Sequence, residues 1–161
     1  MLNAALNRDA LDARLDAFAG ALGQALADKA ALLAADLAAY VRDAKLSGQV
    51  LQARTGALRD AIVSDVSVDG GVVSGSVGVA GDIKYAAIQE YGGKTAAHEI
   101  LPAKGDVLAF LSAAGMVFAR RVEHPGSVIP ERSYLRSSLD DKSAAIIAAF
   151  AQTPDEVWSR A

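Results

Sequence analysis

The sequence predicts an α+β fold in which a long N-terminal helix and a C-terminal helix frame a mostly antiparallel sheet of about five strands. Three observations predict this class. The first third is rich in alanine and spaces its large apolar residues by three, four or seven positions. The last part repeats this helical spacing. The middle holds several runs in which apolar and polar residues alternate. With 161 residues, 52% of them apolar and 22% charged, the chain has the size of one ordinary domain. We therefore expect a single domain over 1–161, with a long Ala-rich helix at 7–46 and a core at 55–161.

The N-terminal segment is expected to form one helix from Asn7 to Leu46. Gly20 and Gly23 indicate either a bend or a place where another backbone comes close. Because this helix is longer than a small core requires, we expect it to serve partly as core and partly as an assembly surface. Its apolar stripe consists of Leu11, Leu15, Phe18, Leu22, Leu26, Leu33, Leu37 and Tyr40.

The middle of the chain alternates turn signals with short elements. Thr55 is a suitable N-cap for a short helix that carries Leu58 and Ile62 on one face. Two alternating valine runs on either side of Gly70-Gly71 predict a β-hairpin. A short helix over Tyr85–Tyr91, ended by Gly92-Gly93, is expected next. Further strands are expected near Glu99–Pro102, Val107–Leu111 and Met116–Val122, and residues 123–130 are expected to form a loop.

The C-terminal part predicts two helices. The first carries Leu135, Leu139, Ile146 and Phe150 on one side. Thr153 followed by Pro154 and Glu156 has the spacing of a capping box with proline at the first helical position. A separate last helix carrying Trp158 is therefore expected.

The chain offers little chemistry from which to build a catalytic site. His98-Glu99 and Glu123-His124 supply metal-ligand types in pairs, but adjacent strand residues point to opposite faces, and the histidines converge only if their strands are neighbours. A metal-assisted hydrolase built on these four residues stays an alternative, while no catalytic residue, cofactor or metal site is predicted. The absence of cysteine excludes thiol catalysis, no apolar run is long enough to span a membrane, and a pI near 5.3 argues against a nucleic-acid-binding surface.

Four segments between residues 55 and 140 carry a recognisable order of motifs. They contain Thr55, Gly56, Leu58 and Arg59; Tyr85, Gln89, Glu90, Tyr91 and Gly92; His124, Pro125 and Gly126; and Pro130, Arg132, Tyr134 and Leu135. In this order they resemble the minor tail, tail-completion and virion-morphogenesis proteins of tailed bacteriophages. The chain departs from that family at Ser133, where a second proline more often follows the arginine.

The resemblance implies a non-enzymatic structural protein of the virion. Such a protein is a tail terminator or completion protein that forms a ring, usually of six copies, caps the tail tube and joins it to the neck of the head. Its partners would be further copies of itself, the tail tube protein and a neck or stopper protein, without a membrane. It would reside at the head–tail junction, and in the host cytoplasm during assembly. A head-side neck adaptor or stopper is the alternative within this class, and a helical adaptor whose residues 7–46 bind a partner helix is a further one.

The motif positions are expected either to hold the fold or to touch partners. Gly56 would allow a tight turn, Arg59 would face outward towards a carboxylate, and Tyr85 and Tyr91 would make semi-exposed contacts. The segment from Pro130 to Leu135 would start the last helix and lock it to the body of the protein. Because six copies at −3 each carry a charge of about −18, DNA is expected to pass through the lumen without specific binding, and no basic belt should line the bore.

Overall fold

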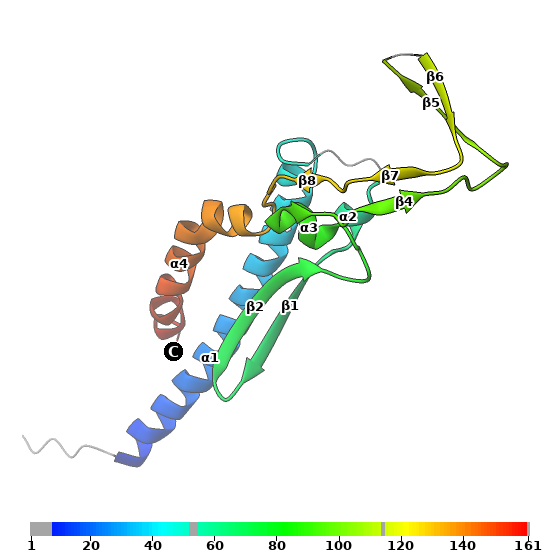
Figure 1. The fold of residues 1–161 in the computed structure, drawn as a ribbon. Coiled ribbons are helices and arrows are strands. Elements are labelled where there is room, and N and C mark those ends of the chain that lie inside the picture. The colour runs from blue at the N-terminus through cyan, green and yellow to red at the C-terminus, as the bar shows by residue number, and fades with distance from the viewer. Residues whose placement is uncertain (1–7, 52–54, 114, 161) are drawn as a thin grey trace, which may run out of the picture. The chain divides into compact units, whose positions relative to one another are not determined.

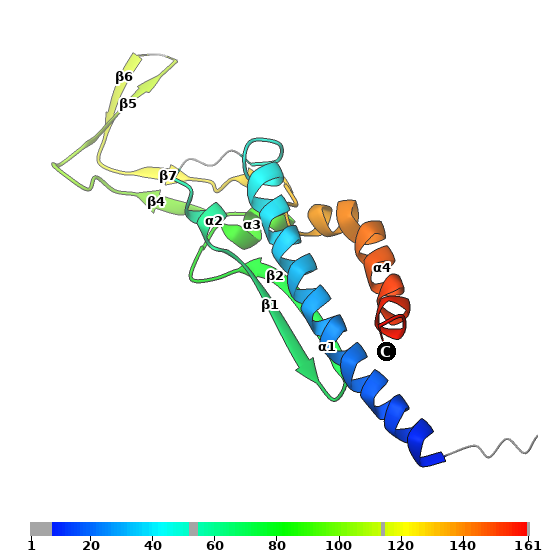
Figure 2. The same ribbon diagram turned by 180° about the vertical axis from the view of Figure 1, so that it is seen from behind.

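The computed structural model describes residues 8–51, 55–113 and 115–160. They form two compact units, one made of the described residues of 8–86 together with 133–160, and the other of the described residues of 87–132 (Figures 1 and 2). The long N-terminal helix, the C-terminal helix and the antiparallel strands confirm the α+β class. Among the described helices, none combines the length and the apolar content that a membrane span requires.

The first unit is built on the long helix. Helix α1 (Arg8–Tyr40) continues into the single π-helical stretch η1 (Val41–Lys45), which confirms the expected helix; Asn7 lies outside the described residues. On one side lies the hairpin of β1 (Ile62–Asp69) and β2 (Val72–Val79), and on another side lies helix α4 (Arg136–Trp158) (Figure 1). The hairpin turns at Gly70-Gly71 and is antiparallel, as expected.

Helix α1 uses a ridge of alanines to receive the hairpin. Ala30, Ala34 and Ala38 recur every four residues and are buried. Opposite them is Gly75 in β2, where an added Cβ would lie 3.6 Å from the Ala30 carbonyl oxygen. Small residues on both sides thus let the helix and the strand pack closely.

The glycines of α1 do not take part in this packing. The helix continues through Gly20 and Gly23, and no described atom lies within 4 Å of a Cβ built at either position. Within the described chain no other backbone therefore comes close to these two glycines, and Gly75 is where helix and strand approach closely instead.

The core of the first unit lies where α1 ends. The buried side chains here are Ala38, Val41, Leu46, Leu58, Ile62, Ala86 and Tyr134. Tyr134 is only 1% exposed, and its hydroxyl donates a hydrogen bond of 3.4 Å to the Ala86 carbonyl oxygen. Tyr134 thus locks the start of α4 to the body of this unit, as expected, whereas Pro130 and Arg132 are exposed and precede α4, which begins only at Arg136.

The short helix α2 (Ala57–Asp60) differs in detail from the prediction. Its N-cap is Gly56, with φ of 80°, while the Thr55 hydroxyl oxygen accepts a 3.4 Å hydrogen bond from the Ala57 N–H. Ile62 does not share this helix but begins β1, where it is buried. The expectation that Thr55 caps the helix and Ile62 lies on it is wrong, because the left-handed glycine sets the start and the strand claims the isoleucine.

The C-terminal helix is continuous, so the separate last helix is also a wrong expectation. Pro154 lies inside α4, and the Thr153 hydroxyl donates 3.1 Å to the Ala149 carbonyl oxygen instead of capping a new helix. A proline removes one helical hydrogen bond. Contacts to α1 hold the last turns in place: Trp158 packs edge-on against Phe18 with ring centroids 5.2 Å apart.

The second unit is a set of nested antiparallel ladders. Helix α3 (Ala86–Tyr91) leads into it and ends at Gly92, as expected. The ladders pair β3 (Gly93–Lys94) with β8 (Val128–Ile129), β4 (His98–Ile100) with β7 (Val122–His124), and β5 (Leu108–Ser112) with β6 (Gly115–Ala119). The described strands therefore form four two-stranded ladders instead of one sheet, and the predicted loop at 123–130 holds part of β7 and all of β8.

Candidate assembly interface

The first motif lies in the first unit and combines a core residue with a surface ion pair. Leu58 is buried, while Thr55 and Arg59 are exposed. The Arg59 Nη2 atom lies 2.8 Å from the Asp43 Oδ1 atom, which confirms that this arginine faces outward towards a carboxylate. Both side chains are exposed to solvent, so the pair contributes little stability.

The second and fourth motifs meet through the backbone of the second unit. The Arg132 N–H donates 2.8 Å to the Gln89 carbonyl oxygen. Gly92 has φ of 69°, and a Cβ there would lie 2.8 Å from the Glu131 nitrogen, closer than real Cβ atoms approach. Glycine is therefore required where α3 ends, because the segment 129–132 packs directly on it.

The third motif forms a tight clasp. Gly126 has φ of 85°, and a Cβ there would overlap the Thr95 carbonyl oxygen. Ser127 and Thr95 exchange hydrogen bonds of 2.8 and 2.9 Å, and the Gly126 N–H donates 3.0 Å to the His124 Nδ1 atom. The His-Pro-Gly segment thus joins the two long sides of the nested ladders.

The candidate metal-ligating residues separate into two pairs. His98 and His124 are directly opposite each other in the register of β4 and β7, with ring centroids 5.0 Å apart, so the two histidines do converge. Glu99 and Glu123 are opposite each other on the other face of the same ladder. Among the described residues no group of three or more ligating side chains is arranged to hold a metal ion.

The motif positions divide by exposure. Leu58, Glu90 and Tyr134 are buried, and Gly56, Gln89, Gly92, His124, Gly126 and Leu135 are half-buried. The exposed positions are Thr55, Arg59, Tyr85, Tyr91, Pro125, Pro130 and Arg132. The Gln89 side-chain oxygen Oε1 is itself buried and accepts no hydrogen bond from the described residues. The motifs therefore hold the fold at about half of their positions and present side chains at the others.

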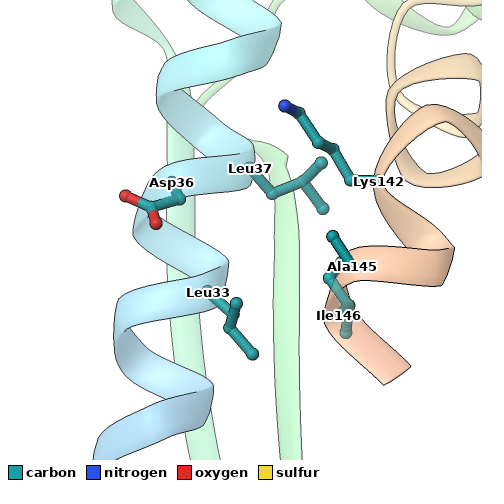
Figure 3. A pocket seen from close by; sticks show the side chains of 6 residues that line it. All are labelled: Leu33, Asp36, Leu37, Lys142, Ala145 and Ile146. Carbon is teal, nitrogen blue, oxygen red and sulfur yellow. The ribbon is translucent and has the colours of Figure 1, made fainter. Parts of the chain in front are cut away.

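A groove runs between α1 and α4 in the first unit. It has a volume of 330 Å³ and is lined by Leu33, Asp36, Leu37, Lys142, Ala145 and Ile146. Figure 3 shows Leu33 and Leu37 pointing towards α4, while the Asp36 carboxylate points away from it. The lining is mainly apolar, and Lys142 supplies one charge at its edge.

Polar contacts hold the groove from both ends. Towards one end the Lys29 ammonium lies 2.8 Å from the Glu156 carboxylate and donates 3.2 Å to the Ala149 carbonyl oxygen. Towards the other end the Asp141 carboxylate accepts hydrogen bonds from the Tyr40 hydroxyl at 2.9 Å and from the Lys45 ammonium at 2.7 Å. These contacts fix the antiparallel register of α1 and α4, so the opening between them belongs to the fold.

The Asp141 cluster is electrostatically coupled. The hydrogen bond from Lys45 lowers the pKa of Asp141, and the hydrogen bond from Tyr40 lowers it further. The same bonds to Asp141 raise the pKa of Tyr40 and the pKa of Lys45. The side chain of Lys142 adds a cation 4.4 Å from the centre of the Tyr40 ring. Sequence reasoning missed this cluster because its two halves, on the end of α1 and on α4, lie about 100 residues apart and carry no spacing signal.

The β5–β6 ladder exposes several large apolar side chains in the second unit. We call residues 108–119 the arm, of which Ala114 lies outside the described residues. Leu111 is 78% exposed, Phe118 66% and Met116 60%. Neither strand contains a charged residue. The sequence carried a signal for this surface, since Phe110 and Leu111 are adjacent apolar residues and therefore point to opposite faces of a strand.

Neither face of the arm is polar. The register places Leu111 opposite Met116 on one face, and Phe110 opposite Val117 on the other.

No protein family, curated protein or solved structure matches the chain.

Proposed function

We propose that this chain is a structural protein of a tailed-phage virion, a tail terminator or tail-completion protein. In this proposal it assembles as a ring, usually of six copies, caps the tail tube and joins the tube to the neck of the head. A head-side neck adaptor or stopper is the alternative role, because such a protein would use the same ring architecture on the other side of the junction.

The observation that carries the proposal is the arm. A two-stranded ribbon with apolar side chains on both faces is marginal in water, and large exposed apolar patches mark surfaces that other proteins cover. Leu111, Met116 and Phe118 form such a patch on one face of β5–β6. Such a surface is expected on a protein whose function is to assemble with further copies or with other proteins.

The exposed motif side chains support the same proposal. Tyr85 is 43% exposed, Tyr91 is exposed, and the Arg132 side chain is exposed although its backbone is anchored. Tyrosine and arginine are enriched at protein–protein interfaces because they combine a large contact area with a polar end. The fold therefore holds the motif backbone in place while the side chains of Tyr85 and Arg132 are exposed to solvent.

The test is removal of the coding sequence from the phage or prophage genome that carries it, followed by electron microscopy of the particles. Tubes of uncontrolled length beside filled heads indicate a terminator. Filled heads that lose their DNA indicate a stopper or adaptor. Normal infectious particles would overturn the proposal for both roles.

A pair of charge reversals sharpens this test. Arg132→Glu and Arg160→Glu change exposed arginines, the first inside the motif order and the second outside it. We expect Arg160→Glu to restore infectious particles in complementation and Arg132→Glu to reduce them at least about tenfold, because an interface charge is reversed. Equal restoration by both variants would remove Arg132 from the interface.

A further inference from the structure

We propose that the arm of one copy binds in the α1–α4 groove of a second copy. This inference rests on the proposed function, which requires copies of the chain to assemble, and it names the two surfaces that meet. The arm face that carries Leu111, Met116 and Phe118 would insert between Leu33 and Ile146 of the neighbouring copy.

The volume of the groove suits this occupant. A cavity of about 150 Å³ holds a benzene ring, so the groove has room for about two side chains of that size. The arm offers Phe118 and Leu111 on a single face. The groove would receive these side chains between apolar walls at Leu37, Ala145 and Ile146, while the Lys142 ammonium at its edge lies 4.4 Å from the centre of the Tyr40 ring.

The elements that carry the two surfaces differ in net charge, although the arm strands hold no charged residue and the groove lining holds one aspartate and one lysine. Helices α1 and α4 together carry five basic and nine acidic residues, a net charge of −4. Residues 101–121, which contain the arm and its flanks, carry Lys104, Arg120 and Arg121 against Asp106, a net charge of +2, and Arg121 is paired with Glu99 at 3.4 Å. Opposite potentials favour the encounter of an arm with the helix pair of another copy.

The apolar area of the arm also points to a macromolecular partner. Leu111, Met116 and Phe118, which share the face that would insert, together expose an area on the order of 400 Å², within the range of the largest patch on a typical monomer. A standard interface covers about 800 Å² on each partner. This face of the arm would supply about half of that area.

The arm and the groove are different surfaces, so this contact is head-to-tail. Each copy would give its arm to one neighbour and its groove to the other. A head-to-tail contact closes into a ring when its rotation divides a full turn, and otherwise grows into a filament. The proposed ring therefore needs one kind of contact, repeated.

Cysteine cross-linking tests the contact without a background reaction, because the chain has no cysteine. Leu111→Cys in the arm and Ala145→Cys in the groove change exposed side chains. We expect a mixture of these two variants to form a disulfide-linked heterodimer under mild oxidation. Leu32→Cys is the matched control for the groove, since Leu32 is exposed on α1 but does not line it.

The double variant Leu111→Cys with Ala145→Cys distinguishes an arm that binds the groove of another copy from an arm that binds the groove of its own copy. A ladder of linked copies, with a closed product at the size of the ring, supports the inference. Linkage only within single chains would show that the arm seats on its own groove and would overturn it. Equal linkage of Leu111→Cys to Ala145→Cys and to Leu32→Cys would overturn it as well.

A charge placed in the arm gives a second readout. Phe118→Asp should reduce cross-linking between Leu111→Cys and Ala145→Cys at least about tenfold, because the carboxylate would enter an apolar groove. Val128→Asp, which changes another exposed apolar residue of the same unit, should leave it unchanged. If Phe118→Asp abolishes cross-linking but still restores normal particles in the deletion strain, the proposed function stands and the arm–groove contact is overturned.

Discussion

Gly126→Ala is predicted to break the clasp of the His-Pro-Gly segment. An alanine at φ of 85° costs about 1–2 kcal/mol in the left-handed region. Its Cβ would also overlap the Thr95 carbonyl oxygen, so Thr95 must move away from Ser127. Losing the two hydrogen bonds between these residues adds about 1 kcal/mol each, which gives a total of about 3–4 kcal/mol.

Gly105→Ala is the matched control for this prediction. Gly105 lies in the same unit at φ of 79°, and no described atom lies within 4 Å of a Cβ built there. Gly105→Ala should lower the free energy of unfolding only by the cost of placing an alanine in the left-handed region, about 1–2 kcal/mol. Hydrogen exchange of the amides at Thr95 and Ser127 measures the difference, with protection falling at least about tenfold more in Gly126→Ala. Equal loss of protection in the two variants would refute the assigned contact with Thr95.

Three further predictions concern the first unit. Tyr134→Ala should cost about 3–5 kcal/mol in urea unfolding, because the ring is only 1% exposed and its removal opens the core. Asp141→Asn should lower the melting temperature at neutral pH and much less at pH 3. A carboxyl whose pKa is lowered by folding stabilises the fold above its unfolded pKa of about 4, and this contribution is lost as the pH falls through the folded pKa. A difference in melting temperature between wild type and variant that does not change with pH would contradict this. Arg59→Ala should change the unfolding free energy by less than about 1 kcal/mol, since its ion pair is exposed, and a loss above 2 kcal/mol would show a role that the pair does not explain.

The parts of the fold that follow local rules could be predicted from the sequence. The spacing of apolar residues on the first helix, the valine alternation around Gly70-Gly71 and the glycine that ends α3 are signals within a few residues of one another. Arg59 was expected to face a carboxylate, and Asp43 supplies it. The helix spacing, the hairpin and the glycine at the end of α3 rest on backbone geometry that neighbouring residues determine.

The errors occur where tertiary contacts override a local signal. Pro154 reads as the start of a helix, but the contact of Trp158 with Phe18 holds the last turns in one continuous helix. Ile62 has helical spacing from Leu58, yet its burial beside the end of α1 places it in a strand. The two-residue strands β3 and β8 are too short to show any period, so their pairing has no signature in the sequence.

The candidate site shows the same division. The histidines at 98 and 124 give no sequence signal of their pairing, because it depends on which strands are neighbours. The groove arises from polar contacts between residues about 100 positions apart, such as Tyr40 and Asp141. The arm, by contrast, was open to prediction, because adjacent apolar residues on a strand cannot all face a single core.

Burial in this chain links stability to assembly. Ten apolar side chains are buried among the described residues, while nineteen large apolar ones are exposed, many of them on the arm and on α4. A chain of this length ordinarily buries more, and net stability is a small difference between large terms. Binding that covers exposed apolar surface adds to the stability of the folded state by mass action. If the chain forms the proposed ring, the contact that joins neighbouring copies would also stabilise each of them, and it would cover the apolar arm face whose exposure otherwise favours aggregation.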